Sequence, residues 1–148
     1  MNWLQNYAII ILPLLAGSIT QILKLITDKI RGNFTWHDLV TSYGGMPSSH
    51  TAFVVSLTTI LGLKIGLTDP IFGVSVILTF IVIRDAMGFR TILGDQNKVL
   101  NKLVNSLSPA QKNGLPPLKE RIAHTLPEII VGSLCGIIIS LIYYWIIF

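Results

Sequence analysis

The sequence predicts an all-α integral membrane protein, with about four transmembrane helices and one interfacial amphipathic helix. Of its 148 residues, 51% are hydrophobic and only 12% are charged, a balance that excludes an ordinary soluble domain. Four apolar stretches are long enough, or nearly so, to cross a bilayer, which needs about 20 residues per helix. We expect residues 1–148 to form a single transmembrane domain.

The four apolar stretches are the expected transmembrane helices. They run over Trp3–Leu23, Thr51–Leu67, Pro70–Ile83 and Pro127–Phe148. The first is expected to be a retained helix and not a secretory signal, because no Lys or Arg precedes it and no Ala-x-Ala type site follows. The second is short and carries Lys64 near its far end, and the third has a polar extension to Arg90.

A further helix is expected in the long loop before the last stretch. Between Asp95 and Leu107 the apolar residues recur at helical spacing, and Asn and Lys residues fill the other face. Such a helix is suited to lie in the plane of the membrane interface. Residues Lys119–Ala123 are expected to add one helical turn before His124.

The basic residues predict the orientation of the chain in the membrane. Of the eleven Lys and Arg residues, three follow the first stretch, one lies near the far end of the second, and seven lie at the end of the third stretch or in the loop after it. Cytoplasmic loops carry the Lys and Arg excess, so both termini should lie outside. We therefore expect an integral protein of the bacterial cytoplasmic membrane. The net charge of +4 follows from the same bias, and no basic–aromatic interleaving indicates nucleic acid.

Two histidines stand at equivalent places, each where a loop becomes a membrane helix, and the topology puts both on the cytoplasmic face. His50 closes the run Gly44-Gly45-Met46-Pro47-Ser48-Ser49-His50, and His124 precedes the last apolar stretch. Helix amino ends have unsatisfied N–H groups and a positive dipole, which favour an anion such as phosphate. Ser48 is the expected N-cap of the helix that begins near His50. Two such ends together would make a phosphate site at the lipid headgroups.

Glu128 lies four residues after His124, so the two side chains share a face on a continuous helix. The carboxylate could hold one ring nitrogen as a donor and leave the other as a nucleophile or base. The alternative is structural, because Thr125-Leu126-Pro127-Glu128 has the pattern of a capping box. Glu120 is a competing partner for His124, and Pro127 disfavours helix at the residue before it. Both interpretations stay open at this point.

Arg84, Asp85 and Arg90 end the third stretch. Charged residues at membrane depth are costly and usually face a polar interior or a partner. No opposite charge lies three or four residues from Arg84 or Asp85, so their partners should come from other helices. We expect Asp85 to support a polar site. For Arg90 the alternative is a side chain that extends to the interface as a positive anchor.

Candidate phosphate-binding side chains are the hydroxyls and cations near the two histidines. They are Ser48, Ser49, Lys24, Arg84, Arg90, Lys119 and Arg121. For Lys24 an ordinary helix ion pair with Asp28 is the alternative. Cys135, the only cysteine, excludes an intrachain disulfide and a thiolate metal site.

With these residues together, the chain resembles the divergent branch of the type-2 phosphatidic acid phosphatase superfamily, which also contains the vanadium haloperoxidases. The usual signature joins Lys-x6-Arg-Pro, Pro-Ser-Gly-His and Ser-Arg-x5-His-x3-Asp. Here Pro47-Ser48-Ser49-His50 matches the second part, and His124-Thr125-Leu126-Pro127-Glu128 matches the end of the third, with Glu in place of Asp. The segment Arg84–Arg90 extends the resemblance over nearly the whole chain. No Lys-x6-Arg-Pro occurs, and Leu118 stands where the third part has Arg.

The resemblance implies a lipid phosphate phosphatase that needs no metal and no cofactor. His124 would attack phosphorus to give a phosphohistidine, and Glu128 would orient its ring. His50 would protonate the leaving alkoxide, while Ser48 and nearby N–H groups would bind the phosphate oxygens. Lys24, Arg84 or Arg90 would supply the positive charge of the missing cations, because the charge of the transition state must be stabilised.

Two other functions stay open. One is a lipid-phosphate binding or transport protein that keeps the pocket without hydrolysis, which the missing first motif suggests. The other is a metal-dependent phosphotransferase, since Asp85, Gly88 and Arg90 faintly resemble the CDP-alcohol phosphotransferase motif. That motif needs several more aspartates, and the aspartates of this chain lack its spacing.

The substrate and the assembly are undetermined from the sequence. Phosphatidylglycerophosphate, phosphatidate and a polyprenyl phosphate or diphosphate all fit an interfacial site. Gly132 and Gly136 have small-x3-small spacing, which predicts close helix packing either within the chain or between two chains of a homodimer.

Overall fold

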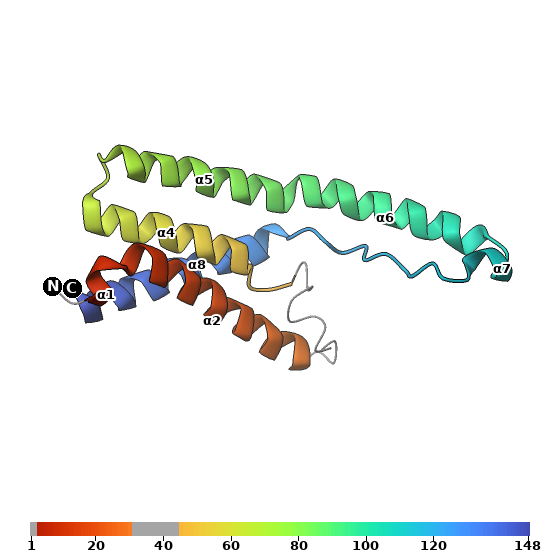
Figure 1. Ribbon diagram of the computed structural model, residues 1–148, viewed down its shortest axis with the longest axis horizontal. Coiled ribbons are helices and arrows are strands. Elements are labelled where there is room, and N and C mark those ends of the chain that lie inside the picture. Colours follow the sequence, from red (N-terminus) through yellow and green to blue (C-terminus); the bar gives the residue numbers. More distant parts are fainter. Residues whose placement is uncertain (1–2, 31–44) are drawn as a thin grey trace.

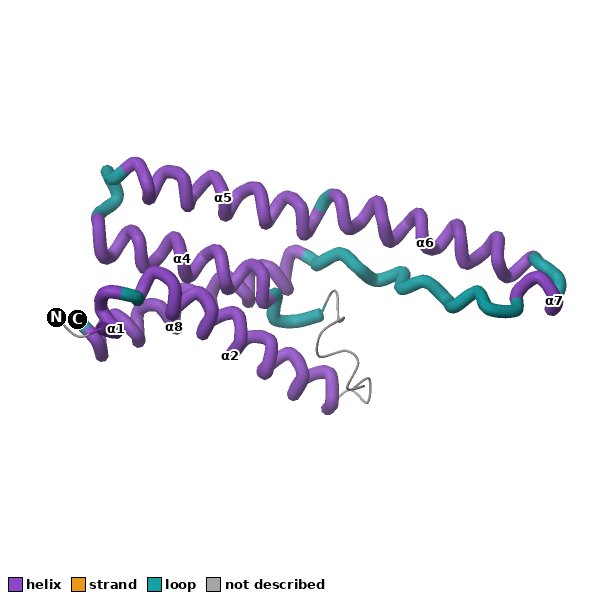
Figure 2. The backbone as a smooth tube through the Cα atoms, viewed as in Figure 1, coloured by secondary structure: helices purple, strands orange, loops and turns teal. Residues whose placement is uncertain are grey.

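The computed structural model describes residues 3–30 and 45–148, and this part of the chain is helical without strands (Figures 1 and 2). The helices are α1 (Trp3–Asn6), α2 (Ala8–Ile30), α4 (Ser49–Ile65), α5 (Pro70–Met87), α6 (Phe89–Ser106), α7 (Pro109–Lys112) and α8 (Leu126–Ile147). Gly44, at the start of the predicted phosphate-binding run, and the side chain of Asp28 lie outside the described residues.

The predicted all-α membrane architecture is confirmed. Helices α2 and α8, and α5 together with α6, are long and apolar enough to cross a membrane, and α4 is a shorter apolar helix. The first predicted stretch is divided at Tyr7 into α1 and α2, and α2 continues beyond the expected end at Leu23 to Ile30. The predicted third helix ends at Met87 and not at Ile83.

Helix α4 lies at the centre of the bundle and packs against α2, α5 and α8. Hydroxyl groups link it to its neighbours inside the apolar region. The Thr58 and Thr79 hydroxyls lie 2.8 Å apart between α4 and α5, and the Ser140 hydroxyl donates to the Ser56 carbonyl at 3.3 Å. Each bond satisfies a polar group that lipid cannot solvate.

Glycines allow α8 to approach α4 closely. Gly132 lies against the backbone of Ser48, and a Cβ atom on Gly136 would stand 2.6 Å from the Ala52 carbonyl oxygen. The small-x3-small face is therefore used within the chain. This packing brings the starts of α4 and α8 together.

The termini lie together at one end of the bundle, and the starts of α4 and α8 lie at the other end (Figure 1). At the terminal end, Lys64 donates to the Gln5 carbonyl at 2.6 Å, and the Gln5 amide donates to the Ile147 carbonyl at 2.7 Å. His50 and His124 thus share the end opposite the termini, which is the relative arrangement that the charge pattern predicts.

Helix α6 begins at Phe89, six residues before the predicted start at Asp95, and continues the direction of α5 beyond the bundle (Figure 1). The chain returns beside α6 as an extended segment, Leu115–Ala123, which we call the strap. The predicted helical turn at Lys119–Ala123 is wrong. Its backbone is extended because the Asn97 and Asn101 side-chain amides donate to the Lys119 and Leu118 carbonyls at 2.7 and 2.8 Å.

The contact between α4 and α8 predicts a difference between two glycine substitutions. Gly136→Ala should lower the free energy of unfolding by about 1–3 kcal/mol, because the methyl group meets backbone that cannot rotate away. Gly73→Ala on α5 is the control, because its Cβ would meet nothing within 4 Å. It should be neutral or stabilising by up to about 1 kcal/mol. Denaturant titration in detergent measures both, and equal midpoints would contradict this account of the packing.

Candidate active site

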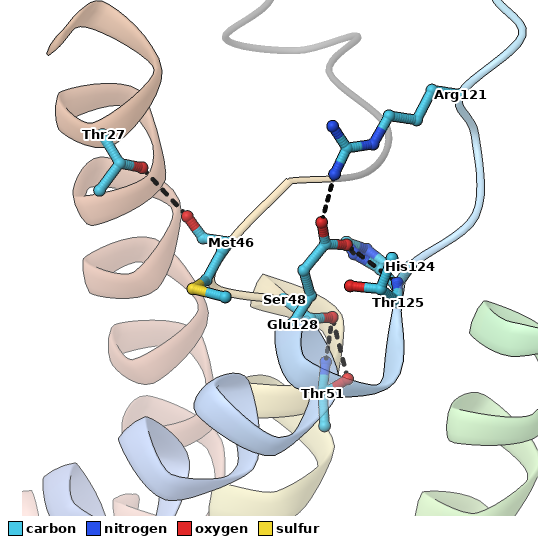
Figure 3. Close-up of polar contacts among 8 residues, drawn as sticks. All are labelled: Thr27, Met46, Ser48, Thr51, Arg121, His124, Thr125 and Glu128. Carbon is cyan, nitrogen blue, oxygen red and sulfur yellow. Dashed lines mark hydrogen bonds and ion pairs between the residues drawn. The ribbon is translucent and has the colours of Figure 1, made fainter. Parts of the chain in front are cut away.

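The starts of α4 and α8 lie side by side (Figure 3). The Ser48 amide donates to the Glu128 carbonyl at 3.1 Å, which joins the two helix ends directly. On the α2 side, the Thr27 hydroxyl donates to the Met46 carbonyl at 3.0 Å and holds the segment that leads into α4. The contact between α4 and α8 and the contact from α2 together hold the amino ends of α4 and α8 in place.

His124 and Glu128 form a buried pair, with side chains only 3% and 4% exposed. The His124 Nδ1 atom lies 3.1 Å from Glu128 Oε2. The Thr125 amide donates to the same oxygen at 3.1 Å, and Thr125 and Glu128 form a capping box. The two interpretations of Glu128 are therefore compatible, because one carboxylate caps α8 and contacts the imidazole. Glu120, the competing partner, instead accepts from the Asn101 amide at 2.8 Å.

The other carboxylate oxygen of Glu128 forms an ion pair with a cation. Arg121 Nη2 lies 2.6 Å from Glu128 Oε1, although the Arg121 side chain is 69% exposed. The buried carboxylate is thus matched by donors on both oxygens, which is what its desolvation requires. Arg121 reaches the site through Glu128.

The carboxylate sets the tautomer of His124. An ionised carboxylate only accepts, so Nδ1 carries the proton and the Nε2 lone pair is left for a reacting atom. Burial lowers the pKa of His124, and the hydrogen bond and charge of Glu128 partly offset this by raising it. The nearby charges of Lys24 and Arg90 lower the pKa further. The ring is therefore neutral at neutral pH, as a nucleophile must be.

His50 stands in the first turn of α4 with an exposed side chain. It interacts electrostatically with His124, Lys24 and Arg90. Lys24, on α2, is only 2% exposed. An ammonium group held at this depth marks a polar site and not a solvated surface. The structure thus brings two imidazoles and two cations from separate helices into one cluster.

Arg90 and Asp85 pair across the joint between α5 and α6. Arg90 Nε lies 3.1 Å from Asp85 Oδ2, and the Arg90 side chain is 18% exposed. The partner of Asp85 is therefore Arg90, five residues further along the same predicted stretch, and not a side chain from a distant helix. Arg90 is therefore not a fully exposed anchor. The His124 amide donates to the Ala86 carbonyl at 3.1 Å, which ties the last turn of α5 to the site.

Ser48 is the N-cap of α4, as predicted. Its hydroxyl is fully buried, accepts from the Thr51 amide at 3.4 Å and lies 2.9 Å from the Thr51 hydroxyl. Ser49 begins the helix and is half-buried. A helix start leaves its first amides without intrahelical partners, and in α4 the first of these are the N–H groups of Ser49 and His50.

The remaining predicted cations lie apart from the cluster. Arg84 is exposed on α5, and Lys119 is exposed on the strap. A cavity of about 390 Å³ adjoins His124 between α6 and the strap. Its charged lining is Arg90, Asp95, Lys98, Glu120 and Arg121.

Sequence reasoning assigned Lys98 only to the polar face of an amphipathic helix. Only the return of the strap along α6 brings this lysine near His124, and no local pattern announces that return. In the described part of the chain, no three His, Cys, Asp or Glu side chains gather as metal ligands.

The sequence matches the model of the family described as the divergent PAP2 family over residues 4–139. The chain belongs to this family. It is 35% identical over 153 residues to "Uncharacterized membrane protein YuiD" of Bacillus subtilis (strain 168), and the match covers 96% of each chain. No solved structure matches.

The pair of Glu128 and His124 predicts the direction of a titration shift. Glu128 raises the pKa of His124, so Glu128→Gln should lower it and keep the ring neutral to more acidic pH. NMR of histidine-labelled protein in detergent reports the midpoint. Glu120→Gln, with its carboxylate on Asn101, is the control and should leave the midpoint in place. A midpoint that rises in Glu128→Gln would contradict the geometry.

Proposed function

We propose that this divergent PAP2 protein is a metal-independent phosphatase of lipid phosphates that acts at the cytoplasmic leaflet. The observation that carries the proposal is the buried pair of His124 and Glu128, with Nδ1 and Oε2 3.1 Å apart, in a cluster with His50 and Lys24. An oriented neutral imidazole beside a second imidazole supplies a nucleophile and a proton donor.

The first step forms a phosphohistidine. Nε2 of His124 attacks phosphorus, the bond from phosphorus to the lipid oxygen breaks, and His50 gives its proton to the departing alkoxide. Glu128 keeps its hydrogen bond to Nδ1 as the ring gains positive charge. Water then attacks phosphorus and loses its proton to His50, which releases phosphate and restores the neutral His124 ring.

The phosphate oxygens carry charge that the site must stabilise in both steps. We assign this role to Lys24 and Arg90, with the free amides at the start of α4. These cations come from α2 and α6 and would take over the role of the three family cations that the chain lacks, the Lys and Arg of the first part and the Arg of the third. At the position of the family's second Arg stands Leu118, whose backbone is bonded to Asn101.

The location of the site supports a membrane-bound substrate. The cluster lies at the end of the bundle opposite the termini, where the basic residues predict the cytoplasmic side. A phosphate on a lipid headgroup would meet this level, while its chains stay in the bilayer.

The second candidate is a lipid-phosphate binding or transport protein. The structural use of Leu118 and the absence of Lys-x6-Arg-Pro favour it, because binding needs fewer aligned cations than a transition state. Both functions use the same pocket, so turnover distinguishes them.

His124→Ala should abolish phosphate release, and His50→Ala should slow it by about 10²–10⁴-fold, the usual contribution of a general acid. The assay measures phosphate released from phosphatidylglycerophosphate, phosphatidate and polyprenyl phosphates in detergent, with and without a chelator. Arg84→Ala, at an exposed position on α5, is the control. Full activity of His124→Ala would exclude the mechanism, and lipid binding without turnover by the unaltered protein would favour the transport function.

Lys24→Ala should reduce kcat by roughly 10²–10³-fold, as for other groups that stabilise charge in the transition state. Lys24→Arg should retain part of the rate because it keeps the charge. Arg84→Ala, an exposed cation at the end of α5, is the matched control and should stay near the unaltered rate. Equal losses in the Lys24 and Arg84 variants would remove Lys24 from the site.

A further inference from the structure

Helix α6 and the strap form one two-layered unit, residues 89–123, which we call the arm. The strap covers the polar face of α6. Besides the two Asn bonds described above, the Leu118 amide donates to the Asn101 side chain at 2.9 Å. At Gly94 the helix has no side chain, so the Glu120 carbonyl passes within 2.5 Å of where a Cβ atom would stand.

The opposite face of α6 is apolar and bare. Ile92, Val99 and Leu103 are 57%, 58% and 58% exposed, and they recur at helical spacing. Phe89 and Leu100 extend the same surface and are also exposed. A continuous apolar stripe of this length is costly in water and marks a surface that something covers.

Charge indicates what covers it. The arm contains six basic and two acidic residues, so its net charge is +4, equal to that of the whole chain. Lys102 lies on α6 beside the apolar stripe and is exposed, and Lys98, also exposed, pairs with Asp95 at 2.9 Å. Apolar side chains flanked by lysines suit the headgroup region of an anionic leaflet. Only Gly88 separates Phe89 from the membrane-spanning α5, so the first turn of α6 lies close to this leaflet.

Helix α6 continues the direction of α5 in the structure (Figure 1), so docking along the membrane surface requires a bend at the joint, Gly88. Gly88 ends α5 and begins α6 without a side-chain cap, at φ −95° and ψ −78°. The strap rejoins the bundle at the same level, since the His124 amide is bonded to Ala86, two residues before Gly88. The two connections of the arm therefore lie together, at Gly88 and just before His124.

We propose that the arm turns at Gly88 and docks the apolar face of α6 on the anionic inner leaflet of the membrane. This goes beyond a helix suited to an interface, because it commits the strap to the cytoplasmic side and the lysines to anionic lipid. This part of the proposal rests on the proposed function: docking of the arm would also place His124 at the level of the lipid headgroups. The reason is that the strap, which is held by α6, leads into His124.

The test places nitroxide labels at Val99→Cys and Leu103→Cys in a Cys135→Ser background, with Asn105→Cys on another side of α6 as the control. The protein is reconstituted in nanodiscs of phosphatidylcholine with or without phosphatidylglycerol. We expect labels 99 and 103 to collide with oxygen more than with a water-soluble nickel chelate, chiefly with phosphatidylglycerol present, and label 105 to show the reverse. Lys102→Glu should weaken this dependence on phosphatidylglycerol.

Three results would overturn the proposal. Frequent collision of all three labels with the nickel chelate would show that the apolar face of α6 is not docked on the membrane. Spin–spin broadening that unlabelled protein dilutes away would show that a second copy covers the face. Equal burial with and without phosphatidylglycerol would remove the role of anionic lipid. None of these readouts depends on turnover, so a failure here is distinct from a failure of the phosphatase.

Discussion

The structure of the site depends on Glu128, which joins three elements at one buried residue. Its carbonyl accepts the Ser48 amide from the start of α4, and its carboxylate accepts the Thr125 amide at the start of α8. The same carboxylate holds His124 and pairs with Arg121 of the strap. A buried carboxylate is stable only when such donors surround it, so the fold and the chemistry depend on the same contacts.

The glycines of α8 make this convergence possible. Gly132 and Gly136 let α8 lie against the backbone of α4, so the two helix starts stand side by side and not a side chain apart. Lys24 from α2 and Arg90 from α6 then supply positive charge from either side. In the mechanism we propose, Lys24 and Arg90 take the place of the family cation that is missing at Leu118 in this chain.

Much of the fold was predictable because apolar length and the capping residues Ser48 and Thr125 are local signals. The pair of His124 and Glu128 was suggested by its spacing, but His124 lies before α8, so the contact arises at the capping box and not along a continuous helix. The path of the strap was not, because it depends on the side chains of Asn97 and Asn101, which bind a backbone about 20 residues away. The sequence likewise does not show that Lys24 and Arg90, among the candidate cations, interact with His124, because that depends on the tertiary structure.

The most direct measurement is the site of phosphorylation during turnover. Protein quenched under alkaline conditions with a lipid phosphate and digested for mass spectrometry should carry an acid-labile phosphate on His124. Phosphopeptide standards or NMR should assign it to Nε2, because Nδ1 is held by Glu128. Phosphate on Nδ1 of His124, or on His50 in its place, would contradict the role of Glu128 on which this account rests.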